Sequence, residues 1–119
     1  VDVRTGWVNV IWQGDASAQT LQCFAVATTP AFVVNVTGPE PLAVADLARR
    51  YGRVFRRDPR LVGTTTSDAL LSDTALAQRL FGAPSVPTAR LVDWVAAWLQ
   101  AGGPTLGRPT KFEVRDGRY

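Results

Sequence analysis

The side chains that most enzymes use as bases, nucleophiles and metal ligands are scarce in this sequence. It contains no histidine and only one cysteine, Cys23. Without histidine, catalytic triads and dyads built on an imidazole base are excluded, and so are histidine-ligated metal sites. Cys23 lies in the apolar run LQCFAV, where we expect a buried and unreactive thiol. The sequence therefore points away from most hydrolase chemistry.

Arginine supplies the most concentrated charge. Six arginines fall close together: Arg49, Arg50, Arg53, Arg56, Arg57 and Arg60. All except Arg50 share one side of a predicted helix, a stripe that could meet the phosphates of a nucleic acid. The opposite side of that helix is apolar, and no aromatic side chain or Gly-rich loop is interleaved with the arginines to read bases. We therefore interpret the stripe as the solvated face of an amphipathic helix and keep a nucleic-acid-binding domain as an alternative.

Length and composition describe the molecule that must position these groups. The chain has 119 residues, of which 46% are hydrophobic and 19% charged, and its net charge is +3. These values predict a single globular domain or fragment over residues 1–119. No uninterrupted apolar stretch is long enough for a membrane span, and no basic segment precedes an apolar core at the N-terminus. We expect a soluble, cytoplasmic protein.

The first third of the chain alternates strand and helix patterns. Residues 7–12 (WVNVIW) are β-branched and aromatic, which predicts a short strand. Asp15 is then a predicted N-cap for a helix that carries Ala18, Leu21 and Val26. Thr29-Pro30 stops that helix, and the continuous apolar run at residues 32–36 (FVVNV) predicts a strand covered on both faces, with Asn35 bonded to neighbouring backbone.

Three further helices are predicted. Apolar residues recur at helical spacing from Val44 to Phe55, ahead of the stop at Asp58-Pro59. Ser72-Asp73 caps a helix that ends near Phe81 before Gly82, and a last helix carries an apolar stripe from Leu91 to Leu99. On that stripe, Trp94 and Trp98 are expected to pack in a core or an interface. Short strands are possible at residues 61–63 and 112–114, so the pattern indicates an α/β architecture.

The order of these motifs resembles the C-terminal part of the extended short-chain dehydrogenase/reductases, the NAD-dependent sugar epimerases and dehydratases. WVNV followed by DASAQTLQCFAVA is similar to the family's short strand and the Asp-led helix behind it. FVVNVTGPEPLAVADLARRYGRVF resembles its strand ending in Asn, then Gly-x-Glu-Pro, then an amphipathic helix. SDTALAQRLFG and DWVAAW resemble the capped helix and the closing helix. The resemblance covers nearly the whole chain. It implies that the chain is the small substrate-binding C-terminal portion of an extended Rossmann-type enzyme, with about four helices and short strands.

The catalytic half of that family is not found in this sequence. The family carries a Gly-rich phosphate turn and a Tyr-x-x-x-Lys pair, whereas the only lysine here, Lys111, has no tyrosine four residues before it. The resemblance thus implies that the N-terminal Rossmann domain is absent from this chain, and that the chain alone binds no cofactor and holds no metal or catalytic residue. NAD or NADP would belong to the parent enzyme, an isomerase or oxidoreductase that oxidises a sugar carbon to a ketone intermediate.

The resemblance also suggests which residues would face a sugar or nucleotide-sugar substrate. Arg4 falls near the family's phosphate-binding arginine, and Thr65 stands where nucleotide-sugar members have the arginine of an Arg-x-x-Asp pair that ends here at Asp68. Asn9 and Trp12 are the other expected contributors to the substrate cleft.

The implied partner is the missing Rossmann domain, or a second copy that associates through Phe32–Val36. An interaction module that acts alone, without a ligand, is the other function class that the sequence leaves open.

Overall fold

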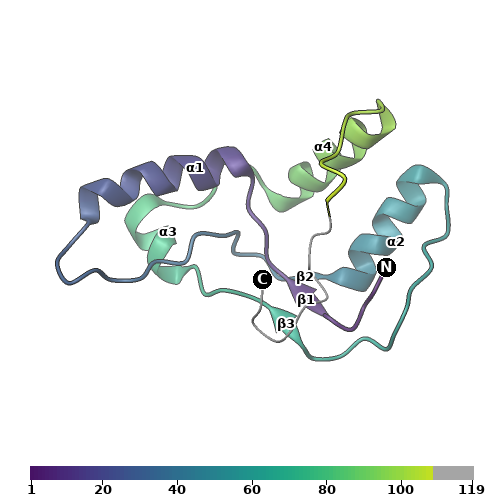
Figure 1. The fold of residues 1–119 in the computed structure, drawn as a ribbon, viewed down its shortest axis with the longest axis horizontal. Helices are drawn as coiled ribbons and strands as arrows, with labels where there is room; N and C mark the ends of the chain where they lie inside the picture. Colours follow the sequence, from purple (N-terminus) through teal and green to yellow (C-terminus); the bar gives the residue numbers. More distant parts are fainter. Residues whose placement is uncertain (109–119) are drawn as a thin grey trace.

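The computed structural model describes residues 1–108 and shows a mixed α/β fold. In that part of the chain, four α-helices accompany a small three-stranded sheet (Figure 1). The elements in chain order are β1 (Trp7–Val8), α1 (Gln13–Gln22), a 3₁₀ helix (Cys23–Val26), β2 (Leu42–Ala43), α2 (Val44–Phe55), β3 (Ala69–Leu70), α3 (Ala75–Phe81) and α4 (Thr88–Gln100). The predicted α/β class is confirmed, and so is the expectation of about four helices with short strands.

The sheet is built around β1, which pairs on both sides with distant segments. β1 runs antiparallel to β2, with Trp7 opposite Ala43, and parallel to β3, with Trp7 opposite Ala69. Gly6 precedes β1 and donates its N–H to the Asp68 carbonyl at 2.8 Å. A Cβ atom on Gly6 would lie 2.2 Å from the Thr66 carbonyl oxygen. Only glycine lets the backbones approach this closely, so Gly6 fixes the pairing of β1 with β3.

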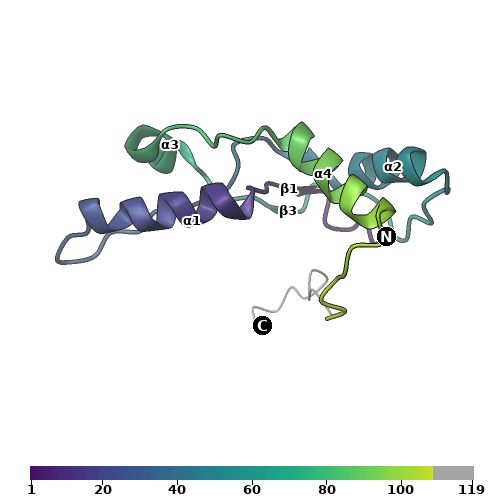
Figure 2. The ribbon, with the colours of Figure 1, turned by 90° about the horizontal axis from the view of Figure 1, so that it is seen from above.

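The helices form two pairs on either side of the sheet. α1 packs with α3, and α2 packs with α4 (Figures 1 and 2). α2 is strongly amphipathic, with Val44, Ala45 and Ala48 buried. The face of α4 that meets α2 contributes Val92 and Ala96, which are also buried. These small side chains let the two helices approach closely, so the largest part of the core lies between them.

That core is modest for a chain of this length. The buried apolar side chains of the described residues are Val3, Val44, Ala45, Ala48, Ala77, Val92 and Ala96. The radius of gyration is 16.2 Å, whereas a compact chain of this length would give about 13.5 Å. Large apolar side chains instead lie at the surface, and Phe24 and Val33 are 81% and 83% exposed. The fold thus leaves apolar surface uncovered that a compact domain would bury.

Several predicted elements are confirmed. α2 and α4 follow the apolar stripes from Val44 to Phe55 and from Leu91 to Leu99. α3 follows Asp73, whose Oδ1 accepts the N–H of Ala75 at 2.9 Å, and ends at Gly82 with φ of 82°. Val62 pairs with Asp2 in an isolated parallel bridge, close to the short strand considered at residues 61–63. The possible strand at residues 112–114 lies outside the described residues.

The prediction of a buried strand at Phe32–Val36 is wrong. No residue of this segment belongs to a strand, and Phe32 and Val33 are exposed. Asn35 donates its side-chain N–H to the Asp73 carbonyl at 3.3 Å, so its amide bonds to backbone as expected. The apolar run has the composition of a covered strand, but the described residues provide no neighbouring strand with which it could pair.

Two boundaries near the N-terminus also differ from prediction. The strand expected over residues 7–12 ends at Val8, and residues 9–12 form neither strand nor helix before α1 begins at Gln13. The predicted N-cap Asp15 lies inside the first turn of α1, whose N-cap position is taken by Trp12 without a side-chain bond. Asp15 instead binds the loop before α4, so its carboxylate joins two elements.

Candidate functional site

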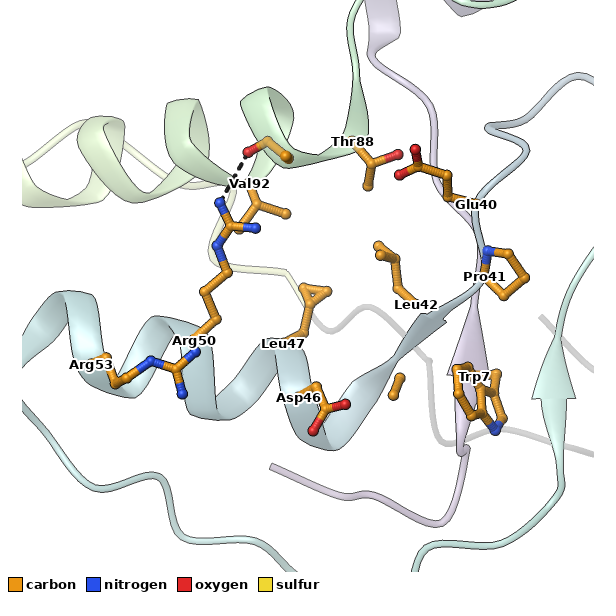
Figure 3. A pocket seen from close by; sticks show the side chains of 12 residues that line it. Trp7, Glu40, Pro41, Leu42, Asp46, Leu47, Arg50, Arg53, Thr88 and Val92 are labelled. Carbon is orange, nitrogen blue, oxygen red and sulfur yellow. Dashed lines mark hydrogen bonds between the residues drawn. The ribbon is translucent and has the colours of Figure 1, made fainter.

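A groove between the start of α2 and the start of α4 is a candidate site (Figure 3). Its volume is about 390 Å³. The strand β2 and Trp7 of β1 form one end, and the two helices form the sides. The lining residues are Trp7, Glu40, Pro41, Leu42, Ala43, Asp46, Leu47, Arg50, Arg53, Thr88, Ala89 and Val92.

The groove combines an apolar floor with polar groups at its edges. Leu42, Leu47 and Val92 point towards its centre, and Trp7 closes one end with 41% of its surface exposed (Figure 3). The Glu40 carboxylate and the Thr88 hydroxyl face each other at the mouth (Figure 3). Binding sites for small molecules commonly have this composition, in which apolar contacts supply affinity and a few polar groups set orientation.

Two arginines of α2 line the groove in different ways. Arg50 donates to the Asp93 carboxylate at 2.5 Å and to the Ala89 carbonyl at 3.3 Å, so it braces α2 against α4. Arg53 makes no side-chain hydrogen bond or ion pair with any residue of the described part of the chain. Its guanidinium is therefore the cation in this groove that is free to meet an anionic group of a ligand.

A second hollow, of about 230 Å³, continues the groove beyond Glu40 and Thr88, which line both. Its other lining residues are mostly apolar: Val10, Ile11, Gly38, Pro39, Ala83, Pro84, Val86, Pro87 and Leu91. The two hollows together form an elongated groove, which we call the α2–α4 groove. It offers hydrogen-bonding groups at its middle and a cation at one end, so it is suited to an elongated ligand with an apolar portion, hydroxyl groups and an anionic end.

Asp15 holds the α3–α4 loop that forms one wall of this second hollow. Its carboxylate accepts the Ser85 hydroxyl at 2.6 Å and the Val86 N–H at 3.0 Å. The hydrogen bond from Ser85 is the main cause that lowers the pKa of Asp15, with backbone N–H groups acting in the same direction against the effect of burial. A charged Asp15 therefore positions Val86 in the wall of the groove.

The residues suggested by the family resemblance lie elsewhere and have partners of their own. Arg4 donates from Nε to both carboxylate oxygens of Asp2, at 3.1 and 3.0 Å, and this bonding raises the pKa of Arg4. Asn9 donates to the Gly38 and Ser72 carbonyls, both at 2.9 Å, and accepts the Ser72 N–H at 3.2 Å. Its amide thus ties the end of β1 to two loops.

The remaining suggested residues are divided between two places. Trp12 packs edge-to-face on Trp94, with ring centroids 5.8 Å apart, but Trp94 and Trp98 are 44% and 55% exposed, so neither lies in a core. Thr65 is exposed, and the Asp68 carbonyl accepts the Gly6 N–H. The neighbouring Thr66 hydroxyl donates to the Arg4 carbonyl at 2.6 Å. The structure therefore brings Arg4 together with residues 65–68, but neither they nor Asn9 and Trp12 line the α2–α4 groove.

The sequence reasoning missed Trp7, Glu40 and Thr88 as candidate site residues, and it considered Arg53 only as a member of the arginine stripe. One signal could have indicated Glu40, because it lies between two prolines in the turn GPEP that leads into β2. Thr88 has no such signal, since its position opposite Glu40 depends on the packing of α2 against α4.

Comparison with protein-family models and with curated proteins finds no relative of this chain. Within residues 1–108, no helix is both long and apolar enough to cross a membrane. The same residues contain no group of three or more cysteine, aspartate or glutamate side chains placed to hold a metal ion.

Proposed function

We propose that this chain is the substrate-binding and structural lobe of an NAD(P)-dependent epimerase/dehydratase-like enzyme that acts in the cytoplasm on a sugar or nucleotide-sugar. In this proposal a Rossmann domain outside the chain binds the dinucleotide and supplies the Tyr and Lys of catalysis. The chain contributes one wall of the substrate cleft and no reacting group.

The observation that carries the proposal is the uncovered apolar segment at residues 31–36. It lies beside the end of α1, and Phe32 and Val34 line an apolar hollow there together with Cys23 and Val26. Leu21 and Phe24, near the end of α1, and Val33, in the apolar segment, each expose more than two-thirds of their surface. An apolar segment without strand partners is a site at which another sheet can add. The Rossmann domain of the proposed enzyme would cover this surface.

The composition of the α2–α4 groove supports the substrate class. A sugar ring presents both apolar C–H faces and hydroxyl groups, which suit the Trp7 ring and the hydroxyl-binding groups of Glu40 and Thr88. A phosphate or carboxylate on the ligand would meet the free Arg53 guanidinium. This arrangement needs no histidine and no metal.

The test begins with the reading frame upstream of Val1. We expect it to encode a βαβ unit with a Gly-rich turn and a Tyr-x-x-x-Lys pair. Isothermal titration should then show that the longer protein binds NAD or NADP, whereas the 119-residue chain alone binds neither. An upstream frame without that unit, or micromolar binding of a dinucleotide by the 119-residue chain, would contradict the assignment of the cofactor site to another domain.

The groove is tested in the longer protein with Glu40→Ala and Trp7→Ala. We expect KM for the sugar substrate to rise by about tenfold or more, while dinucleotide affinity is unchanged. The matched controls are Asp58→Ala and Trp98→Ala, since neither residue lines the groove. Equal effects in the two pairs would place the substrate elsewhere.

A further inference from the structure

Four arginines converge on a separate hollow at the C-terminal end of α2. This arginine hollow has a volume of about 380 Å³. It is lined by Arg49, Gly52, Arg53, Arg56, Arg57, Asp58 and Pro59. It thus gathers arginines from the last two turns of the helix and from the turn that follows.

The backbone is shaped so that the turn folds back beside the helix. Arg56 adopts the left-handed conformation, with φ of 51° and ψ of 44°, and ends α2. Arg57 then donates its N–H to the Gly52 carbonyl at 2.9 Å. A Cβ atom on Gly52 would lie 2.7 Å from Cδ of Pro59, so the missing side chain is what admits the returning turn. The concave form of the hollow therefore follows from Gly52 and from the conformation of Arg56.

The charges in the arginine hollow are not balanced within the described chain. Arg49 pairs with Asp46 at 2.8 Å. Arg53, Arg56 and Arg57 make no side-chain hydrogen bond or ion pair with residues 1–108. Asp58 is the one acidic residue among the lining side chains. The partial negative charge at the end of a helix, about half an electron charge, offsets only a small part of this positive charge.

We propose that the arginine hollow binds a multiply charged phosphate group of a small molecule, a polyphosphate or diphosphate. Guanidinium groups donate pairs of parallel N–H bonds to phosphate oxygens, and three of them are free to do so here. A concave surface favours a compact anion over a long duplex. No aromatic side chain lines the hollow to stack on a base, which also argues against a nucleic acid.

This site is separate from the proposed substrate groove, although Arg53 lines both. The test therefore changes Arg56 and Arg57, which line only the arginine hollow. The 119-residue chain is titrated with inorganic tripolyphosphate and with orthophosphate at low salt. We expect tripolyphosphate to bind the more tightly, and Arg56→Gln with Arg57→Gln to weaken its binding by about tenfold or more.

Arg79→Gln with Arg90→Gln is the matched control, because it removes the same charge from exposed positions on α3 and α4. We expect this pair to change the affinity by less than about twofold, as the general field of the protein is screened over a Debye length. Circular dichroism of both pairs checks that α2 is retained. Equal weakening by the two pairs, or no tripolyphosphate binding at millimolar concentration, would overturn the proposal.

Two further ligands identify what carries the phosphate. ATP that binds more tightly than tripolyphosphate would support a nucleotide as the small molecule, and equal binding would support recognition of the phosphates alone. A DNA or RNA duplex that binds more tightly than either, with a steep loss of affinity as salt rises, would overturn the proposal in favour of a nucleic-acid surface.

Discussion

Asp15 illustrates how one carboxylate can serve a different purpose from the one its sequence position suggests. In the first turn of α1 it benefits from the positive end of the helix, but it accepts hydrogen bonds from Ser85 and Val86 in the loop before α4. It therefore links residues that are 70 positions apart in the chain. Loss of its charge should therefore destabilise the α3–α4 loop as well as α1.

We expect Asp15→Asn to lower the free energy of unfolding at pH 7 by about 1 to 2 kcal/mol, since hydrogen bonds to a charged acceptor are stronger than those to an amide. The folded state lowers the pKa of Asp15. Its contribution is therefore complete above about pH 4, the ordinary aspartate pKa, and is lost as pH falls through the lower folded-state pKa. Urea denaturation of both proteins from pH 2 to 7 should show a difference that narrows on acidification. A difference independent of pH would show that the carboxylate charge is not involved.

Arg56 carries a conformational cost that can be measured separately from its charge. Its φ of 51° is unfavourable for a side chain with a Cβ atom, by about 1 kcal/mol or more. Arg56→Gly should raise the free energy of unfolding by about 0.5 kcal/mol, because glycine accepts this conformation but gains entropy when unfolded. Arg56→Gln retains the cost and should leave stability close to that of the original protein. Stabilisation of equal size in both variants would point to relief of charge repulsion instead.

At the scale of elements, α2 and α4 were predictable because each has a continuous apolar stripe and a clear stop. α2 shows this well, since its stripe begins at Val44 and the chain stops at Asp58-Pro59. The run FVVNV was mispredicted as a strand because its composition is typical of a strand. Composition does not show whether a neighbouring strand is present to pair with it. β3 was missed because two residues, Ala69 and Leu70, give no periodic signal, and their pairing with β1 depends on contacts across the chain.

The candidate groove was less predictable than the elements around it. Glu40 and Thr88 are far apart in the chain and come together only because α4 packs across α2. Family resemblance directed attention to Arg4 and Asn9, whose side chains bond within the fold. A sequence pattern places residues on elements, whereas a groove requires the packing angle between those elements as well.

Gly6 provides a prediction for the sheet. In Gly6→Ala the new methyl group would meet the Thr66 carbonyl at 2.2 Å, and a backbone atom cannot move aside as a flexible side chain can. The pairing of β1 with β3 should open, and unfolding free energy should fall by about 2 kcal/mol or more. Gly102→Ala is the control for an added methyl group without the close contact: no heavy atom lies within 4 Å of its Cβ, and its positive φ of 73° alone should cost about 1 kcal/mol. Denaturation that shows similar losses in both variants would contradict the close approach at Gly6.

At the scale of the whole molecule, the chain is extended, 50 Å along its longest axis and 24 Å along its shortest, and two helix pairs lie on either side of the sheet. Such a shape exposes apolar surface at its ends. We expect the 119-residue chain to self-associate through residues 32–36 when no other surface covers them. Val33→Lys should reduce that association, since Val33 is 83% exposed and its replacement adds charge without disturbing the core.

Light scattering over a range of concentrations measures this effect. The control is Val95→Lys, which adds the same charge to an exposed position of α4. A chain that stays monomeric at high concentration before any substitution would show that the segment needs no partner. Equal loss of association in both variants would assign the contact to general apolar surface.

The sheet also has a consequence for how the protein folds. β1 finds its partners 36 and 62 residues further along the chain, at Ala43 and Ala69, and each strand contributes only two residues. Helices of this length form within about a microsecond. The sheet instead forms only after two long segments of chain have closed into loops. That closure costs chain entropy and gains few hydrogen bonds. The sheet should therefore assemble last and open first, and its amide protons should exchange with solvent sooner than those in the middle of α2.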